Sequence, residues 1–310
     1  MVPMSPTPVE LPFRAGLNPH TDACGRRLDE WARRTGASAA VSAWAGYRLG
    51  PLAGRLFPTA SPAVLDLTGR YLTWLCVYDD HFDPGSQGDR LPYASAVARD
   101  VVNMLRGAPP PPDEQLVVAL LRYWRDDVVG VASPEWWRRC VVDLAQVARG
   151  ITDEVGARAR GGTPDVEAYL AHRRRSMGIT VLTNLMELAE HLEVPDDLRV
   201  RYRFQDLRSA VLDMASVGND LISLRKEVRA GESHNLVLLM CRTRGCDVVE
   251  GEKIVRDWLA RMVVDYLALK GELRLSLPAA EAEVVTRYAG GLETMLRGMV
   301  DWGMETSRYR

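Results

Sequence analysis

Apolar residues recur along most of this chain at intervals of three and four positions, and the two-residue alternation of a half-buried strand is nearly absent. The run that starts at residue 141, VVDLAQVARGITDEVGARAR, has the spacing of an amphipathic helix. Similar patterns occupy residues 22–34, 62–78, 93–106, 113–130, 165–190, 197–227, 252–269 and 279–305. The chain is therefore predicted to be all-α, with about ten helices and no sheet.

The segments between these helices are short and carry clear breaking residues. DPGSQGDRLP (83–92) and GAPPPPD (107–113) are rich in proline and glycine, and RAGESHN (229–235) reads as a polar turn. None of them is long enough to be a flexible linker, and no stretch repeats at a fixed period. Residues 1–310 are predicted to form a single domain, a helical bundle.

Charge and cysteine content narrow the class of function. A net charge of -2, from 39 basic and 41 acidic residues, argues against nucleic acid as the main partner. The five cysteines include no C-x-x-C pair, so a structural zinc site is not expected, and their odd, scattered placement fits a reducing cytoplasm. The start, MVPMSPTPVELPFRAG, lacks signal-peptide features, and no apolar run approaches about 18 residues, so no membrane insertion is expected.

One acidic stretch follows a mostly apolar helix, in YLTWLCVYDDHFDPGSQGD (71–89). Asp79 and Asp83 are four residues apart and share a helix face, with Asp80 beside them. Carboxylates that close together are costly to bury unless a cation meets them. Either this is a solvated helix end or it binds a positive species. The other Asp-Asp pairs of the chain, 126–127 and 196–197, lack the third acid.

A second polar stripe lies in the segment DMASVGNDLISLRKE (213–227). Asn219, Ser223 and Glu227 stand at i, i+4 and i+8, and each step drifts by only about 40° around the helix, so their oxygens share one stripe. Amide, hydroxyl and carboxylate oxygens are hard ligands that suit Mg²⁺, which usually combines few protein ligands with substrate phosphate oxygens. The alternative is a polar stripe that faces solvent.

DDHFD and NDLISLRKE together closely resemble the two metal-binding motifs of class I terpene synthases, the bacterial cyclases above all. The second motif matches at all three ligand positions and is the specific one. FRAGLNPH near the start and SRYR at the end are also similar, so the resemblance spans most of the chain. It implies a single-domain class I terpenoid synthase-like α-helical bundle. It also implies three Mg²⁺ ions, with Asp79 as a direct ligand and Asp80 and Asp83 in supporting roles.

The resemblance further implies an arginine that senses diphosphate, placed before the second motif. HRRRSMGIT offers Arg173, 46 residues before Asn219, although residues 174 and 175 are also arginine and compete for the role. By analogy Ser176 is a linker and the carbonyl of Met177 faces the bond that ionises, with a helix break at Gly178. Without the resemblance, the three arginines read as a solvated face.

Three more residues match positions that bind diphosphate in this family. Lys226 stands beside the last ligand of the second motif, and Arg308 and Tyr309 match a C-terminal Arg-Tyr pair. The residues alone would suggest only a frayed tail for that pair. Arginine suits phosphate because its guanidinium is planar and always charged.

The cation left by an ionised substrate needs a dry, apolar cavity, in which aromatic faces stabilise it. Trp302 is the predicted wall residue, with Trp74 behind it, although both could be plain core. The family often places aromatic residues three and four positions before the first aspartate, and this chain has Leu75 and Cys76 there. With only four phenylalanines in the chain, we expect a less aromatic cavity.

The resemblance thus predicts a Mg²⁺-dependent terpene cyclase in the cytoplasm, with an isoprenoid diphosphate as substrate and a homodimer as a possible assembly. Farnesyl diphosphate is favoured by length and layout, and geranylgeranyl diphosphate is the alternative. An isoprenyl diphosphate synthase would normally carry two aspartate-rich motifs, and a class II cyclase would need a D-x-D-D stretch, which is absent. A non-catalytic helical binding protein would leave both oxygen stripes as coincidence.

Overall fold

The computed structural model describes residues 8–37, 47–82, 86, 90–160, 165–230 and 234–309. Within these ranges it has thirteen α-helices and no strand. The helices are α1 (Thr21–Arg34), α3 (Leu49–Leu56), α4 (Pro62–His81), α5 (Leu91–Leu105), α6 (Leu116–Val129), α7 (Pro134–Arg160), α8 (Val166–Ser176), α9 (Ile179–Ala189), α10 (Asp196–Arg199), α11 (Tyr202–Ala230), α12 (Leu236–Arg244), α13 (Val248–Ser276) and α14 (Ala279–Glu305), and a 3₁₀ turn, η2 (Ser307–Tyr309), follows. The all-α prediction is confirmed.

Helix positions agree well where the apolar pattern is long. The range 279–305 coincides with α14, and the predicted break at Gly178 divides 165–190 into α8 and α9. α3 and α12 were missed because helices of eight and nine residues are too short for a period to stand out.

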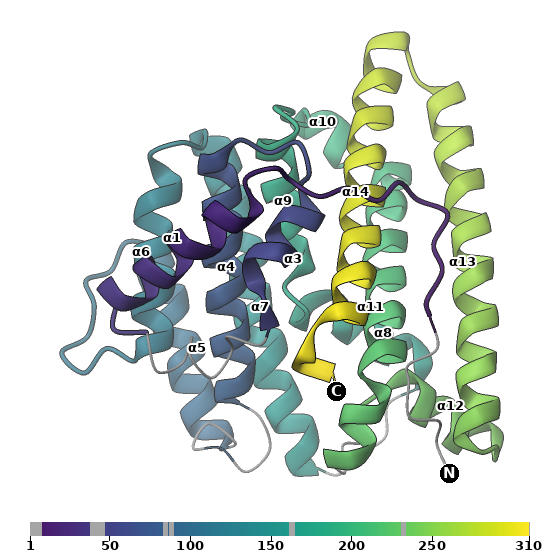
Figure 1. The fold of residues 1–310 in the computed structure, drawn as a ribbon, viewed down its shortest axis with the longest axis horizontal. Helices are drawn as coiled ribbons and strands as arrows, with labels where there is room; N and C mark the ends of the chain where they lie inside the picture. Colours follow the sequence, from purple (N-terminus) through teal and green to yellow (C-terminus); the bar gives the residue numbers. More distant parts are fainter. Residues whose placement is uncertain are drawn as a thin grey trace.

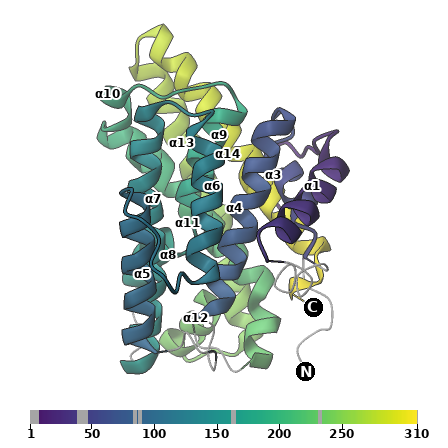
Figure 2. The ribbon, with the colours of Figure 1, turned by 90° about the vertical axis from the view of Figure 1, so that its left-hand side faces the viewer.

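The long helices stand side by side as a bundle (Figure 1), with α5 and α7 toward one side and α1 and α3 toward the other (Figure 2). α4, α9, α11 and α14 pack toward the middle: α4 contacts α9, and α14 contacts both α9 and α11. No helix among the described residues is long and apolar enough to cross a membrane.

An extended segment before α1 runs alongside α13 and then across α14 (Figure 1). Arg297 on α14 donates to the carbonyl of Leu11 at 3.0 Å, and Arg256 on α13 donates to that of Pro8 at 2.9 Å. The ring of Phe13 meets Tyr266 edge-on at 6.0 Å. The beginning of the described chain is thereby fixed to the two helices at its end.

α4 carries the first acidic motif, and its start is well defined. Ser61 is the N-cap, its hydroxyl accepts from the amide of Val64 at 3.4 Å, and Pro62 fills the first helical position. Ten of its residues are buried on several sides of the helix, so α4 is a central element. It ends at His81 with Phe82 as its C-cap, immediately before the part of the acidic motif that contains Asp83, which lies outside the described residues.

Candidate active site

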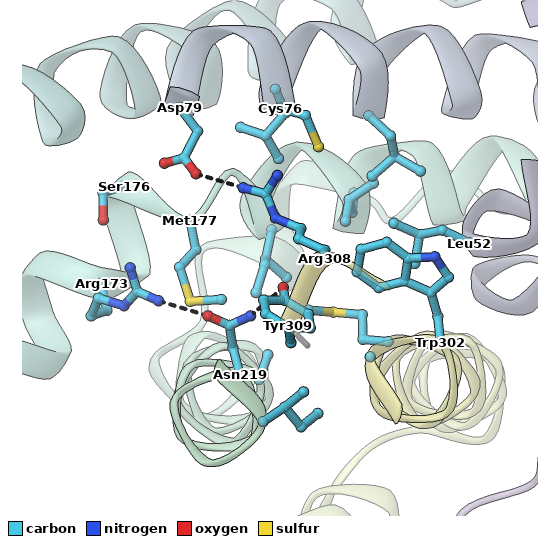
Figure 3. Close-up of a pocket in the computed structure, with 18 of the residues that line it drawn as sticks. Leu52, Cys76, Asp79, Arg173, Ser176, Met177, Asn219, Trp302, Arg308 and Tyr309 are labelled. Atoms are coloured by element: carbon cyan, nitrogen blue, oxygen red, sulfur yellow. Dashed lines mark hydrogen bonds and ion pairs between the residues drawn. The ribbon is translucent and has the colours of Figure 1, made fainter. Parts of the chain in front are cut away.

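A cavity of about 380 Å³ opens between α4, the α8–α9 junction, α11 and α14 (Figure 3). Its inner walls are largely aliphatic, with Leu52, Leu72, Leu75, Ile179, Leu182 and Leu296 among the residues that line it. Charged and polar side chains gather at one end, including Asp79, Arg173, Asn219 and Arg308. A site with one polar and one apolar end suits a ligand that joins an anionic group to a hydrocarbon chain.

The cavity face of α4 is a single helical stripe. Leu72, Leu75, Cys76 and Asp79 follow one another at i, i+3, i+4 and i+7, and all four line the cavity. Trp74, predicted to belong to the pocket behind the wall residue Trp302, does not line the cavity: its indole is fully buried and donates to the carbonyl of Val117 at 2.9 Å. The reason is rotation, because Trp74 lies five residues, or about 140°, from Asp79 around the helix.

Asp79 and Asp80, the two described acids of the first motif, both contact Arg308. Arg308 donates from Nη2 to Asp79 at 3.1 Å and to Asp80 at 3.3 Å. The Arg308 side chain is 9% exposed and that of Asp79 49%, so the carboxylate remains open to the cavity. Partial desolvation inside the cavity raises the pKa of Asp79, and the positive charge of Arg308 opposes that shift. The ring of Tyr47 lies 4.8 Å from the Arg308 guanidinium and supports it from the other side.

The second motif contacts two of the four predicted diphosphate-binding residues, which we call the clamp: Arg173, Lys226, Arg308 and Tyr309. Asn219 accepts from Arg173 Nη2 at 3.0 Å through Oδ1 and donates from Nδ2 to the Tyr309 hydroxyl at 3.0 Å. Figure 3 shows Arg308 and Tyr309 between Asp79 on α4 and Asn219 on α11. The C-terminal Arg-Tyr pair therefore joins the two motifs, which lie 140 residues apart in the sequence.

The other two residues of the second motif are Ser223, which is buried, and Glu227, which is half-buried. The Ser223 hydroxyl is buried and has no hydrogen-bond partner in the described structure. Burial raises the pKa of Glu227 to about 7, and the charge of Asp220 adds to the shift. A buried hydroxyl with open hydrogen-bonding capacity, beside a carboxylate whose pKa is raised by burial, fits a hard cation such as Mg²⁺. Among the described residues no three histidines, cysteines or acids converge into a metal cluster. The predicted ligands that the structure describes lie on two helices, α4 and α11.

The structure separates the three consecutive arginines. Arg173 lines the cavity and also contacts Asp220 at 3.3 Å. Arg174 turns to α11, where it makes a bidentate pair with Asp213 at 2.5 and 2.6 Å, and Arg175 is exposed. Of the three, Arg173 is in place to meet a diphosphate.

The residues after Arg173 form the expected break. Ser176 and Met177 line the cavity, and Gly178, the N-cap of α9, has a φ of 70°. Lys226 also lines the polar end.

Few aromatic residues line the cavity. Trp302 lines the cavity and donates to the carbonyl of Tyr47 at 2.7 Å, and its ring meets Tyr309 edge-on at 6.0 Å. No phenylalanine is among the described lining residues, and Leu75 and Cys76 line the cavity at the two positions where the resemblance predicts aromatic residues.

Several residues of the site carried no sequence signal. Glu154 and Arg158 on α7, and His234 before α12, line the polar end, and Tyr47 supports the clamp. Asn235 donates from Nδ2 to Glu227 Oε2 and to the Asp220 carbonyl, both at 2.8 Å, and also caps α12. None of them lies on a helix that carries a motif, so only the fold brings them in.

Comparison with known proteins agrees with this geometry. A family model described as terpene synthase family 2, C-terminal metal binding, matches residues 70–265. The chain belongs to this family. Pristinol synthase from Streptomyces pristinaespiralis is 29% identical, with 97% of this chain and 84% of that protein aligned. (+)-T-muurolol synthase ((2E,6E)-farnesyl diphosphate cyclizing) from Roseiflexus castenholzii is 28% identical, with 96% of this chain and 92% of that protein aligned.

Solved structures show the same likeness. The crystal structure of germacradien-4-ol synthase from Streptomyces citricolor matches with a TM-score of 0.84 and 28% identity, covering 98% of this chain and all of that one. A variant of cucumene synthase with one substitution matches with a TM-score of 0.85 and 26% identity, covering 97% of this chain and all of that one. The chain is a class I terpene synthase with the helical fold of that class, and thus a carbon–oxygen lyase acting on phosphates.

Proposed function

We propose that this terpene synthase cyclises farnesyl diphosphate with the help of Mg²⁺ and releases a sesquiterpene hydrocarbon or alcohol. The observation that carries the proposal is the bridge made by Arg308 and Tyr309, which joins Asp79 and Asn219 over the polar end of one apolar cavity. The printed names of two aligned relatives, (+)-T-muurolol synthase and (-)-beta-caryophyllene synthase, specify cyclisation of (2E,6E)-farnesyl diphosphate. Those names support the choice of chain length.

The polar end binds and orients the diphosphate. Asp79, Asn219, Ser223 and Glu227 would hold the metal, with Asp80 and Asp83 in support, and three Mg²⁺ ions bound there would stabilise the negative charge that develops on the leaving group. Positively charged and hydroxyl donors of the chain then hydrogen-bond the diphosphate oxygens, and charge-assisted bonds of this kind are short and strong. The donors are Arg173, Lys226, Arg308 and Tyr309.

The apolar end folds the hydrocarbon chain and excludes water. Aliphatic side chains from α3, α4, α9 and α14 make most of the wall, so a carbocation inside is shielded from early capture. The Trp302 ring offers the cation an aromatic face. Because one cavity draws on helices from α3 to α14, we treat residues 1–310 as a single terpene synthase domain.

The proposal also covers the cellular location and the assembly of the enzyme. All five cysteines are free, which supports a cytoplasmic enzyme. The homodimer stays a prediction.

A panel of substrates tests the proposed function. Geranyl, farnesyl and geranylgeranyl diphosphate are offered separately with Mg²⁺, and release of inorganic diphosphate gives kcat/KM for each. We expect the highest value with farnesyl diphosphate. A highest value with geranylgeranyl diphosphate would replace the sesquiterpene assignment by a diterpene one. Chain extension on addition of isopentenyl diphosphate would instead indicate an isoprenyl diphosphate synthase.

A further inference from the structure

The helix break beside the polar end is held by a residue of another helix. Tyr71 on α4 donates a hydrogen bond from its hydroxyl to the carbonyl of Gly178 at 2.7 Å, across 107 residues of sequence. Both residues are buried. The Tyr71 hydroxyl thus reaches the N-cap of α9, where α8 ends and the chain turns.

The same contact leaves no room for a side chain at the break. A Cβ atom at Gly178 would lie 2.6 Å from the Tyr71 hydroxyl oxygen and 2.7 Å from Leu75 Cδ1. The φ of 70° at Gly178 is also one that other residues rarely adopt. Glycine at 178 and tyrosine at 71 therefore fit each other, and α4 approaches the backbone of the break directly.

Tyr71 is itself firmly placed. Its ring packs on Trp74 and Trp124, with centroids 5.7 and 5.6 Å apart. The two indoles donate to the carbonyls of Val117 and Leu67 at 2.9 and 2.8 Å, so the aromatic group is fixed from behind. Burial raises the pKa of Tyr71 well above its ordinary value, and its hydroxyl remains a donor at neutral pH.

The break joins the two parts of the site. Arg173 lies one turn before it on α8, and Ile179, the first residue of α9, lines the apolar cavity. Two turns after Tyr71, α4 carries Asp79. A single hydrogen bond thus ties the helix that carries the acidic motif to the junction between the diphosphate clamp and the hydrocarbon wall.

We infer that Tyr71 is a positioning residue for ionisation: its hydrogen bond to Gly178 fixes the backbone at Met177 and Gly178 relative to the substrate bond that breaks. This inference rests on the proposed function. Without the hydroxyl, the Gly178 carbonyl is left buried and unpaired, and the break can shift to find another partner. Small displacements at a reacting centre cost large factors in rate.

The test compares Tyr71→Phe with Tyr78→Phe. Tyr78 is on the same helix, is also fully buried and packs on the same Trp74 at 5.1 Å, but its hydroxyl has no partner in the described structure. Each substitution removes one buried hydroxyl and keeps the ring. Kinetics and products with farnesyl diphosphate, together with binding of inorganic diphosphate and Mg²⁺ by calorimetry, are measured at a temperature at which circular dichroism shows all proteins folded.

We expect Tyr71→Phe to lower kcat by about tenfold to a hundredfold and to change the product proportions. KM and the affinity for diphosphate with Mg²⁺ should stay within about twofold, because the clamp residues are untouched. Tyr78→Phe should match the wild type in each measurement.

Two results would overturn the inference. In one, Tyr71→Phe keeps the wild-type kcat and products. In the other, the kcat of Tyr71→Phe falls only as far as its loss of thermal stability explains, and its products match those of the wild type. A purely structural role for Tyr71 requires that result. The wild-type enzyme serves as the reference in each assay, so its own turnover tests the proposed function separately from the variants.

Discussion

Arg308 and Asp79 are 229 residues apart in the sequence and form an ion pair at 3.1 Å at the polar end of the cavity. The arginine contributes a planar fork that can bind either the carboxylate or a diphosphate oxygen. This pair places the end of the chain at the acidic motif and makes the C-terminal turn part of the site.

Arg308→Ala is expected to lower kcat/KM for farnesyl diphosphate by about a hundredfold, because a buried charge-assisted donor is lost. Arg308→Lys keeps the positive charge but not the planar guanidinium, and its kcat/KM should lie between those of the wild type and Arg308→Ala. Steady-state kinetics measures both. An alanine variant within about threefold of wild type would remove Arg308 from the clamp.

The three consecutive arginines should behave differently. Arg173→Ala is expected to reduce kcat/KM by about a hundredfold, since Arg173 alone of the three lines the cavity. Arg174→Ala loses the pair with Asp213 and should lower the melting temperature by roughly 2 °C with little effect on turnover. Arg175→Ala serves as the exposed control. Loss of turnover in the Arg174 or Arg175 variant alone would reassign the sensor.

Glu227 should make the folding stability of the metal-free protein depend on pH. Its pKa is raised to about 7 by burial, so its contribution to stability is present below the unfolded-state pKa and is lost as pH rises through about 7. The melting temperature of the wild type should therefore fall more than that of Glu227→Gln between about pH 5 and pH 8. If the melting temperatures of the two proteins change with pH in the same way, the raised pKa of Glu227 is contradicted.

Asn235 should matter for metal affinity although it touches no substrate. Asn235→Asp keeps an oxygen that caps α12 but removes both donors and places a negative charge against Glu227. We expect the Mg²⁺ concentration for half-maximal activity to rise by about tenfold to a hundredfold. Asp247→Asn, at the exposed N-cap of α13, is the matched control and should leave that concentration unchanged. An unchanged Mg²⁺ requirement in Asn235→Asp would limit the residue to its cap.

Trp302 should shape the products. Trp302→Ala removes the indole from the wall and is expected to slow turnover and shift the mixture toward products of early deprotonation. Trp302→Phe keeps an aromatic face and should retain more of the main product. Gas chromatography of the extracts measures the proportions. An unchanged mixture in the alanine variant would make the residue plain core.

The parts of the site that lie on one helix could be predicted from the sequence. Asn219, Ser223 and Glu227 share a stripe because helical geometry is local, and the start and end of α14 agree with the pattern. Trp74 was misplaced because α4 is buried on several sides, so periodicity does not say which face meets the cavity.

Contacts between distant elements had no local signal. The approach of Tyr71 to Gly178 depends on how α4 packs against the α8–α9 junction, and the bond from Asn235 to Glu227 depends on how the start of α12 packs against α11. The choice among the three arginines of α8 also required the structure. Arg173 faces α11 at Asn219, beside the cavity, whereas Arg174 faces α11 at Asp213.

The central claim is that one site ionises farnesyl diphosphate with Mg²⁺ and closes a ring. The most direct measurement incubates the purified protein with farnesyl diphosphate and Mg²⁺, with and without a chelator, and identifies the hexane extract by gas chromatography–mass spectrometry. We predict a cyclic sesquiterpene or its alcohol that disappears with the chelator. An extract without any cyclic product, or one unaffected by the chelator, would contradict the account.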